Sequence, residues 1–295
     1  MKLEFLAPQT LQDAVTMAKA RGDAARFIAG GTDLVIQARK SGTWPEAVIN
    51  LQQIPDLGEI KGSGQNFSLG SLVTHRQIER EGRFAGALEA LRESACVIGG
   101  HQVRNVATVG GNLCNASPAA DMVPILLCLN AEVALAGSEG RRVVPLASFI
   151  EGPRRTKRAH DEVMTEIAFS APAQKSASAF LKGGRRRAME ISIVAMAGVV
   201  SVSRDGKLTD VRLAMGAAGP KAIRLTEVEK FLEGKALSKD VLEETGRLAA
   251  AAASPIDDVR ASASFRRHLA GVYARRVVEL SWNRISEVGN DRSAA

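Results

Sequence analysis

The sequence has few residues of the kinds that hold metals. Its 295 residues include only three cysteines, Cys96, Cys114 and Cys128, and no CxxC pair. Because four thiolates normally hold an iron–sulfur cluster, this chain alone cannot bind one in the usual way. The four histidines show no HExxH or paired ligand spacing. No Gly-x-Ser-x-Gly or Cys–His–acid arrangement indicates a hydrolase, and the sequence predicts neither a catalytic residue nor a metal ligand.

Aromatic residues are also scarce, at 4 % with a single tyrosine, so few rings are available for stacking on bases. The chain nevertheless carries 39 basic and 32 acidic residues, a net charge of +7, with clusters such as Arg154-Arg155 and Arg185-Arg186-Arg187. These clusters are typical of a solvated surface or of a docking face for an acidic partner. Nucleic-acid binding is not expected.

Long apolar runs are missing too. The longest, Met122–Leu129 and Ile191–Val200, are far shorter than a membrane-spanning helix, and the first residues lack the apolar stretch of a signal peptide. We therefore expect a cytoplasmic protein without a membrane span. Apolar residues at 45 % and charged residues at 24 % are typical of a globular chain with a hydrophobic core.

Hydrophobic periodicity divides the chain into three regions. The first predicts a small β-α-β-type unit, in which Thr10 caps a helix over Leu11–Arg21 and strands lie at Arg26–Ala29 and Ala47–Leu51. In the second region the β-branched stretch Val103–Val109 favours an extended conformation.

Farther along the second region, Ala119–Leu129 is apolar almost all round, which predicts a buried helix. The third region, from about Pro172, has β-rich segments followed by helices, an order typical of an α+β module. Asp205-Gly206 indicates a hairpin between two of its strands. The helices are expected at Leu225–Leu232, Lys239–Ala253 and about Ser262 to Ile285.

A first glycine pair stands where a predicted strand turns into a helix, within Phe27–Leu34. Glycine lets backbone N–H groups approach a ligand closely, and the N-terminus of a helix capped by Thr32 or Asp33 adds a positive dipole. Together these features suit a phosphate group. A plain strand–turn–helix connection explains the same residues equally well.

A second glycine pair, Gly110-Gly111, lies within Thr108–Asp121. Ser117 and Pro118 are typical of an N-cap and a first helical residue, which places Asp121 in the first turn of a helix. There its charge either favours the helix dipole or accepts a hydrogen bond from the ribose or adenine side of a nucleotide. Two such segments could grip one diphosphate. Since neither GxGxxG nor GxxxxGK[ST] occurs, the site is neither a Rossmann fingerprint nor a P-loop.

In their order and spacing, the two glycine segments resemble the FAD-binding (medium) subunit of molybdenum hydroxylases, the xanthine dehydrogenase and aerobic carbon monoxide dehydrogenase group. The resemblance spans nearly the whole chain. It is carried by Phe5 to Ala7-Pro8, Ala29–Leu34, Thr108–Asp121, Pro145–Thr156 with Asp161–Met164, and Phe180–Lys182 with Arg185–Ile191.

The resemblance implies an α+β chain: a two-subdomain FAD-binding fold of the vanillyl-alcohol-oxidase (PCMH) type, followed by a C-terminal α+β domain. On this basis we expect the FAD-binding domain over residues 1–173, with subdomains over about 1–56 and 57–173. The C-terminal domain is expected over residues 176–288.

The resemblance also implies which residues hold FAD. In relatives the two glycine segments hold the pyrophosphate, the position of Met164 touches the flavin through its backbone, and Lys182 matches a lysine near the cofactor. The predicted FAD-binding residues are Phe27, Ile28, Ala29, Gly30, Gly31, Thr32, Asp33, Leu34, Thr108, Val109, Gly110, Gly111, Asn112, Asn115, Asp121, Met164 and Lys182.

The implied partners are a large molybdopterin subunit and a small subunit with two [2Fe–2S] clusters, assembled as a dimer of heterotrimers. The implied function is that of an oxidoreductase subunit, which passes electrons from the clusters of a partner chain through FAD to NAD, a quinone or oxygen. The alternatives are a stand-alone flavin- or nucleotide-binding protein and a self-sufficient FAD oxidase.

Overall fold

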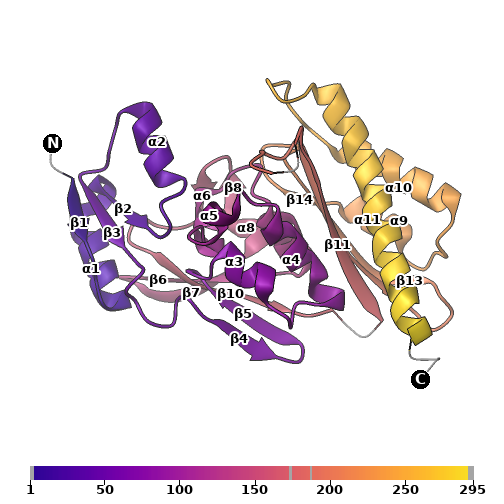
Figure 1. Cartoon of the computed structure of the whole chain (residues 1–295), viewed down its shortest axis with the longest axis horizontal. Coiled ribbons are helices and arrows are strands. Elements are labelled where there is room, and N and C mark those ends of the chain that lie inside the picture. The colour runs from indigo at the N-terminus through magenta and orange to yellow at the C-terminus, as the bar shows by residue number, and fades with distance from the viewer. Residues whose placement is uncertain (1–2, 173–174, 187, 292–295) are drawn as a thin grey trace.

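The computed structural model describes residues 3–172, 175–186 and 188–291, which form three main sheets arranged in a row with helices between and beyond them (Figure 1). The boundary predicted at residue 173 and Arg187 of the basic cluster lie outside the described residues. Within these ranges no helix combines the length and the apolarity needed to cross a membrane.

The first sheet is parallel and small, in the order β1-β3-β2. Its elements are β1 (Glu4–Leu6), α1 (Leu11–Arg21), β2 (Ala25–Ile28), α2 (Leu34–Ser41) and β3 (Ala47–Asn50). The Thr10 hydroxyl accepts the Asp13 N–H at 3.1 Å, so the predicted N-cap of α1 is confirmed. The crossover helices and parallel strands also confirm the predicted β-α-β unit.

The second sheet is antiparallel, in the order β4-β5-β10-β6-β7. Its strands are β4 (Ile60–Ser63), β5 (Asn66–Gly70), β6 (Glu132–Gly137), β7 (Gly140–Pro145) and β10 (Val163–Ser170). Between β5 and β6 the chain forms α3 (His75–Arg80), α4 (Glu89–Cys96), α5 (His101–Arg104), α6 (Val109–Asn115) and α7 (Met122–Cys128). After β7 come α8 (Leu146–Phe149) and the small hairpin of β8 (Ile150–Gly152) and β9 (Arg155–Thr156).

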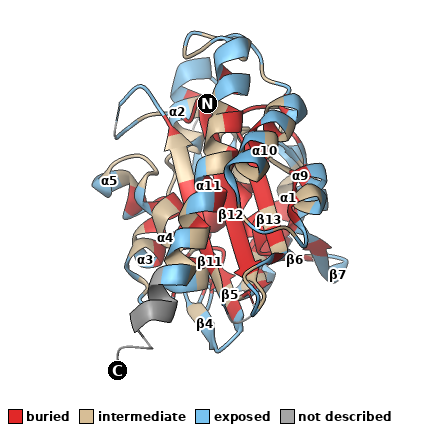
Figure 2. Ribbon diagram, turned by 90° about the vertical axis from the view of Figure 1, so that its right-hand side faces the viewer, coloured by how far each residue is buried: buried red, intermediate tan, exposed pale blue. Residues whose placement is uncertain are grey.

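The third sheet is antiparallel, in the order β11-β12-β13-β14. Its elements are β11 (Ser176–Gly183), β12 (Val194–Val202), β13 (Leu208–Gly216), β14 (Ile223–Arg224), α9 (Thr226–Leu232), α10 (Lys239–Ala252) and α11 (Ala263–Asp291). The predicted hairpin joins β12 to β13, with Gly206 at φ +78°. The long helix α11 crosses the buried strands of this sheet (Figure 2).

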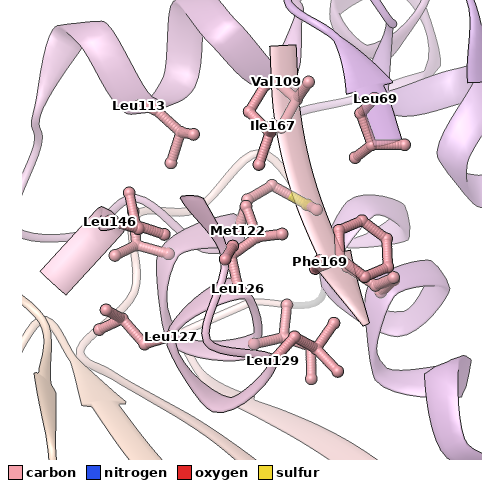
Figure 3. Packing of buried hydrophobic residues seen from close by; sticks show 14 of the residues in the cluster. Leu69, Val109, Leu113, Met122, Leu126, Leu127, Leu129, Leu146, Ile167 and Phe169 are labelled. Atoms are coloured by element: carbon pink, nitrogen blue, oxygen red, sulfur yellow. The ribbon is translucent and has the colours of Figure 1, made fainter. Parts of the chain in front are cut away.

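The helix α7 lies between the second and third sheets. All its residues are buried, as the apolar pattern predicted, and Met122 and Leu126 pack in one cluster with Ile167 and Phe169 of β10 (Figure 3). The same cluster includes Ala197 and other residues of the third sheet. This shared core therefore fixes the C-terminal part of the chain against the second sheet.

Two local predictions are wrong. The stretch Val103–Val109 is not extended but holds the end of α5, a turn and the start of α6. The reason is tertiary: the Arg104 guanidinium donates to the Ile98 carbonyl at 3.2 Å and pairs with Glu79 at 3.0 Å. These bonds fix a compact turn, and they outweigh the weak preference of β-branched residues for a strand.

The helix α7 also begins later than Ser117 and Pro118 indicated. The Ser117 hydroxyl accepts the Ala119 N–H at 3.2 Å within a turn, and the first helical residue is Met122. The Pro118 carbonyl instead accepts the Ala217 N–H of the third region at 2.8 Å. A contact between distant segments thus replaces the local helix start.

Shortening a side chain on α7 tests the shared core. Leu126 is completely buried, so Leu126→Ala is expected to lower the free energy of unfolding by about 2–5 kcal/mol through lost transfer energy and a cavity. Val143→Ala, at a side chain 60 % exposed, serves as the control and should change it by less than about 0.5 kcal/mol. Urea unfolding followed by circular dichroism measures both, and equal midpoints would contradict the assignment.

Candidate flavin site

The two glycine segments lie against each other. A Cβ on Gly30 would overlap the carbonyl oxygen of Val106 and lie 3.0 Å from the Ala107 nitrogen, so only glycine permits this approach of two backbones. Nearby, Gln37 Nε2 of α2 donates to Asn115 Oδ1 of α6 at 2.9 Å. The first and second sheets are therefore joined where the two segments meet.

The first segment offers unpaired backbone donors. The amides of Gly30, Gly31, Thr32 and Asp33 have no hydrogen-bond acceptor within the described residues. Gly31 has φ +70°, and a left-handed residue beside right-handed ones makes the kind of concave nest of N–H groups that binds anions. Because unpaired amides are costly unless something satisfies them, this arrangement suits a ligand with several acceptor oxygens.

The start of α2 differs in one detail from the prediction. Asp33 occupies the N-cap position of α2, but its side chain makes no capping hydrogen bond. The first turn of the helix therefore lacks the side-chain acceptor that the sequence suggested. The Val35 amide in that turn donates instead to the Gly31 carbonyl, at 3.1 Å.

The second segment is the start of a short helix, α6, rather than an open turn. Thr108 is its N-cap, and Thr108 Oγ1 accepts the Gly111 N–H at 3.1 Å. The other amides of Val109–Asn112 donate to the carbonyls of Ser71, Val73 and Thr108, each at 2.9 Å. Because the protein itself uses these donors, the second segment contributes shape and side chains rather than free amides.

The two glycines of the second segment differ in what a larger side chain would meet. A Cβ on Gly110 would lie 2.5 Å from the Ser71 carbonyl oxygen, so packing alone requires glycine there. A Cβ on exposed Gly111 would meet only Thr108 Oγ1, at 3.0 Å. The buried side-chain oxygen of neighbouring Asn112 has no partner within the described residues. The exposed side of Gly111, called its open face below, lies beside the unpaired side-chain oxygen of Asn112. This pair fits a ligand that carries hydroxyl groups as well as phosphates, as FAD does.

Arginines that the glycine motifs did not indicate lie beside the first segment. The Arg158 guanidinium is 5.5 Å from the ring centroid of Phe27, and it is held by the Ala159 and Glu162 carbonyls at 2.9 and 2.8 Å. The Arg154 N–H donates to the Ala116 carbonyl at the end of α6, at 2.9 Å. In the sequence Arg154 stands in a basic cluster and in a block that carries the resemblance, but neither arginine was predicted to contact FAD.

Asp121 and Lys182, both predicted FAD contacts, bind each other. Lys182 Nζ lies 2.7 Å from Asp121 Oδ2 and also donates to the Val97 carbonyl at 3.1 Å. The Ser192 hydroxyl donates to the other Asp121 oxygen. Burial raises the pKa of Asp121, while the charge of Lys182 opposes that rise. The carboxylate does not cap α7; it ties the start of this helix to the third sheet.

Met164, the last predicted contact, stands near the start of β10. Its side chain is buried in the core around α7, beside an irregularity of the strand between Met164 and Glu166. There the Thr165 carbonyl accepts the N–H of Ser71, whose own carbonyl accepts the Gly110 N–H. These bonds connect β10 to the second glycine segment, and a backbone role for Met164 stays a prediction.

The family of the chain follows from comparison with known proteins. A sequence model described as "FAD binding domain in molybdopterin dehydrogenase" matches residues 1–172, and one described as "CO dehydrogenase flavoprotein C-terminal domain" matches residues 179–280. The fold and the site therefore define an FAD-binding subunit of an oxidoreductase. More particularly, the chain belongs to the family of FAD-binding subunits of the carbon monoxide dehydrogenase and xanthine dehydrogenase type, which confirms the resemblance and the α+β fold.

Individual relatives agree with this assignment. The chain is 33 % identical over 246 residues to the nicotinate dehydrogenase FAD-subunit of Eubacterium barkeri, covering 82 % of this chain and 83 % of the relative. It is 30 % identical over 276 residues to the carbon monoxide dehydrogenase medium chain of Afipia carboxidovorans, covering 94 % and 95 %. A solved carbon monoxide dehydrogenase from Hydrogenophaga pseudoflava matches with a TM-score of 0.92 at 28 % identity, covering 96 % of this chain and 98 % of the other.

Removing the cation beside Asp121 gives a pH-dependent prediction. Lys182→Met leaves the carboxylate buried without its partner, which is expected to cost about 3–5 kcal/mol at neutral pH. The folded-state pKa of Asp121 is already raised and rises further without Lys182, so the unfolding free energy of the variant falls as the pH rises above the unfolded value of about 3.9.

Urea unfolding at pH 5 and pH 8 measures this effect, and the deficit of Lys182→Met against the natural chain should be larger at pH 8. Lys19→Met, at an ammonium 61 % exposed, is the matched control and should show little deficit at either pH. A deficit of the same size at both pH values would show that Asp121 is not the group left unpaired.

Proposed function

We propose that this chain is the FAD-carrying electron-transfer subunit of a molybdenum hydroxylase. It passes electrons from the [2Fe–2S] clusters of a partner chain, through FAD, to an external acceptor such as NAD, a quinone or oxygen. The observation that carries this proposal is the pair of adjoining glycine segments, one with four unpaired amides at Gly30–Asp33 and the other with the open face of Gly111.

The residues of this chain bind and orient the cofactor. The amides of Gly30–Asp33 hold pyrophosphate oxygens, since no other group in the described residues accepts from them. Gly111 leaves room for the nucleotide, and Asn112 pairs with one of its hydroxyl groups. FAD itself, when bound, supplies the exchange between one-electron and two-electron steps. The chain needs no acid, base or nucleophile of its own.

Lys182 and Asp121 shape the same site from the side of the third sheet. Both side chains are at most 10 % exposed, and Lys182 holds the Val97 carbonyl, so the segment after α4 is fixed in place. A buried, hydrogen-bonded ammonium in this position can donate to a flavin heteroatom. The family match and the geometry of the pair together support this role.

The partners are proposed to be a large molybdopterin subunit and a small [2Fe–2S] subunit, in a dimer of heterotrimers. Relatives are named as FAD-subunits and medium chains, names that belong to multi-subunit enzymes. The described residues of this chain include no group of three or more His, Cys, Asp or Glu side chains placed to hold a metal. We assign the clusters and the molybdenum centre to the other chains.

Co-purification tests the proposal against its alternatives. The chain is expressed with its genomic neighbours, isolated through an affinity tag, and analysed for subunits, flavin, iron and molybdenum. The proposal predicts a complex that contains all three cofactors. A lone yellow protein that oxidises a substrate by itself would favour a self-sufficient oxidase, and a chain that retains no FAD after reconstitution would overturn the proposal.

A single substitution tests the nucleotide site. Gly111→Val places a branched side chain on the open face, where it meets only Thr108 within the protein. The fold should persist, while the flavin absorbance that survives gel filtration should fall to a small fraction of the original. Gly82→Val, at an exposed glycine with nothing within 4 Å of its Cβ position, is the matched control. Full flavin retention in Gly111→Val would remove Gly111 from the site.

A further inference from the structure

The strand β11 lies between the helices α4 and α11 and forms one edge of the third sheet (Figure 1). The outer backbone groups of an edge strand have no neighbouring strand to pair with. On β11 an ion pair takes that place: Glu93 Oε2 of α4 accepts the Phe180 N–H at 2.8 Å. Arg284 of α11 donates to the Ser178 carbonyl and to the other oxygen of Glu93. Two side chains from different helices therefore bind β11 as the backbone of a further strand would.

Two more contacts fix the register of α4 against β11. The Ala90 N–H, in the first turn of α4 where amides have no partner within the helix, donates to Ser178 Oγ at 3.0 Å. At the other end of α4, Lys182 Nζ donates to the carbonyl of the C-cap residue Val97 at 3.1 Å. With the Glu93 contact between them, the helix is bonded at positions i, i+3 and i+7 of one face and the strand at alternate residues. A shift of β11 along α4 would break all three contacts.

The ion pair contributes more to this register than packing does. The first half of β11, Ser176–Ala179, carries only small side chains, which interlock little with a helix. Glu93 and Arg284 bond to the strand as ionised groups, and such hydrogen bonds are stronger than neutral ones. Their side chains are only 26 % and 25 % exposed, so water competes little for these bonds.

The last of the three contacts holds the charge nearest to the predicted cofactor position. An ammonium has three N–H groups, and Lys182 uses two of them on Asp121 and on the Val97 carbonyl. Under the proposed function, the third is left for a flavin heteroatom. Because reduced flavin carries more negative charge, an ammonium placed there stabilises the reduced form and raises the reduction potential. The potential is then sensitive to where β11 places Lys182.

We propose that Glu93 and Arg284 are positioning residues, which fix the Lys182 ammonium at the flavin by holding β11 in register with α4. The inference rests on the proposed function for the contact between Lys182 and FAD. It adds two residues, 191 positions apart in the chain, that act on the cofactor only through Lys182.

The reduction potential of FAD bound to the full-length chain tests the inference. Glu93→Ala and Arg284→Met each remove half of the ion pair, so β11 loses part of its register and Lys182 donates less well to the flavin. Both variants are expected to lower the equilibrium constant for two-electron reduction of the flavin about three- to tenfold, and tenfold corresponds to about 30 mV. Redox titration followed by flavin absorbance measures this change, and circular dichroism checks the fold.

The direction of the change separates positioning from a direct effect of charge. A lost carboxylate by itself would raise the potential, and a lost guanidinium would lower it. Loss of positioning lowers the potential in both variants. Glu93→Gln, whose amide oxygen can still accept the Phe180 N–H, should restore most of the natural value. Arg284→Met keeps the inference testable if Glu93→Ala does not fold.

Two controls complete the design. Glu89→Ala removes a carboxylate of the same helix that pairs with Arg92 at 3.4 Å and makes no hydrogen bond to β11 in the described part of the chain, so the potential should not change. Lys182→Met with Asp121→Asn removes both charges of the buried pair. In that chain Glu93→Ala should no longer alter the potential, because the route through Lys182 is absent.

The outcomes separate this inference from the proposed function. A natural potential in both Glu93→Ala and Arg284→Met would overturn the positioning role, and so would an undiminished effect of Glu93→Ala in the chain without Lys182. If Lys182→Met with Asp121→Asn itself leaves the potential unchanged, the positioning role also fails while the electron-transfer function stands. If the natural chain binds no FAD, the proposed function fails.

Discussion

The contact between the backbones of Gly30 and Val106 is the constraint on which the site depends. It places the turn after β2 directly against the residues that precede α6, with no space for any side chain larger than glycine. Two segments almost eighty positions apart thereby become one surface. The bond between Gln37 and Asn115, whose separation along the chain is 78, holds the helices on either side in the same relation. Without this approach, the free amides and the open glycine face would belong to separate sites.

The two glycine segments divide the work of binding. In the first, backbone N–H groups find no acceptor in the part of the chain that the structure describes, and they are available to phosphate oxygens. In the second, the amides are used within the protein, and Gly110 is a packing glycine. Gly111 is the exposed residue there, beside the buried and unpaired side-chain oxygen of Asn112. Under the proposed function, a pyrophosphate would therefore receive its hydrogen bonds mainly from the first segment, while the second segment would limit the shape of the nucleotide.

The core around α7 connects this site to the C-terminal region. The helix is buried on every side between two sheets, and Asp121 at its start reaches Lys182 and Ser192 of the third region (Figure 3). The buried ion pair therefore links the second region of the chain, which holds the second glycine segment, to the C-terminal region.

Local sequence patterns predicted the elements that are stabilised by residues close to them in the chain. The cap at Thr10 with α1, the buried helix α7 and the hairpin at Gly206 depend on neighbouring residues and were found. The segment from Val103 was misassigned because Arg104 makes its bonds with residues of other elements. Ser192 carried no signal at all, since it meets Asp121 across 71 positions of the chain. The glycine pairs were visible, but only the structure separates packing glycines from the one that faces outward.

Amide hydrogen exchange of the chain with and without FAD tests the central claim most directly. We expect the amides of Gly30–Asp33 to exchange fast in the FAD-free chain and to become protected when FAD binds. The amides of Val109–Asn112 should be protected in both states, because they already donate within the protein. Exchange at Gly30–Asp33 that is the same with and without FAD would contradict the account.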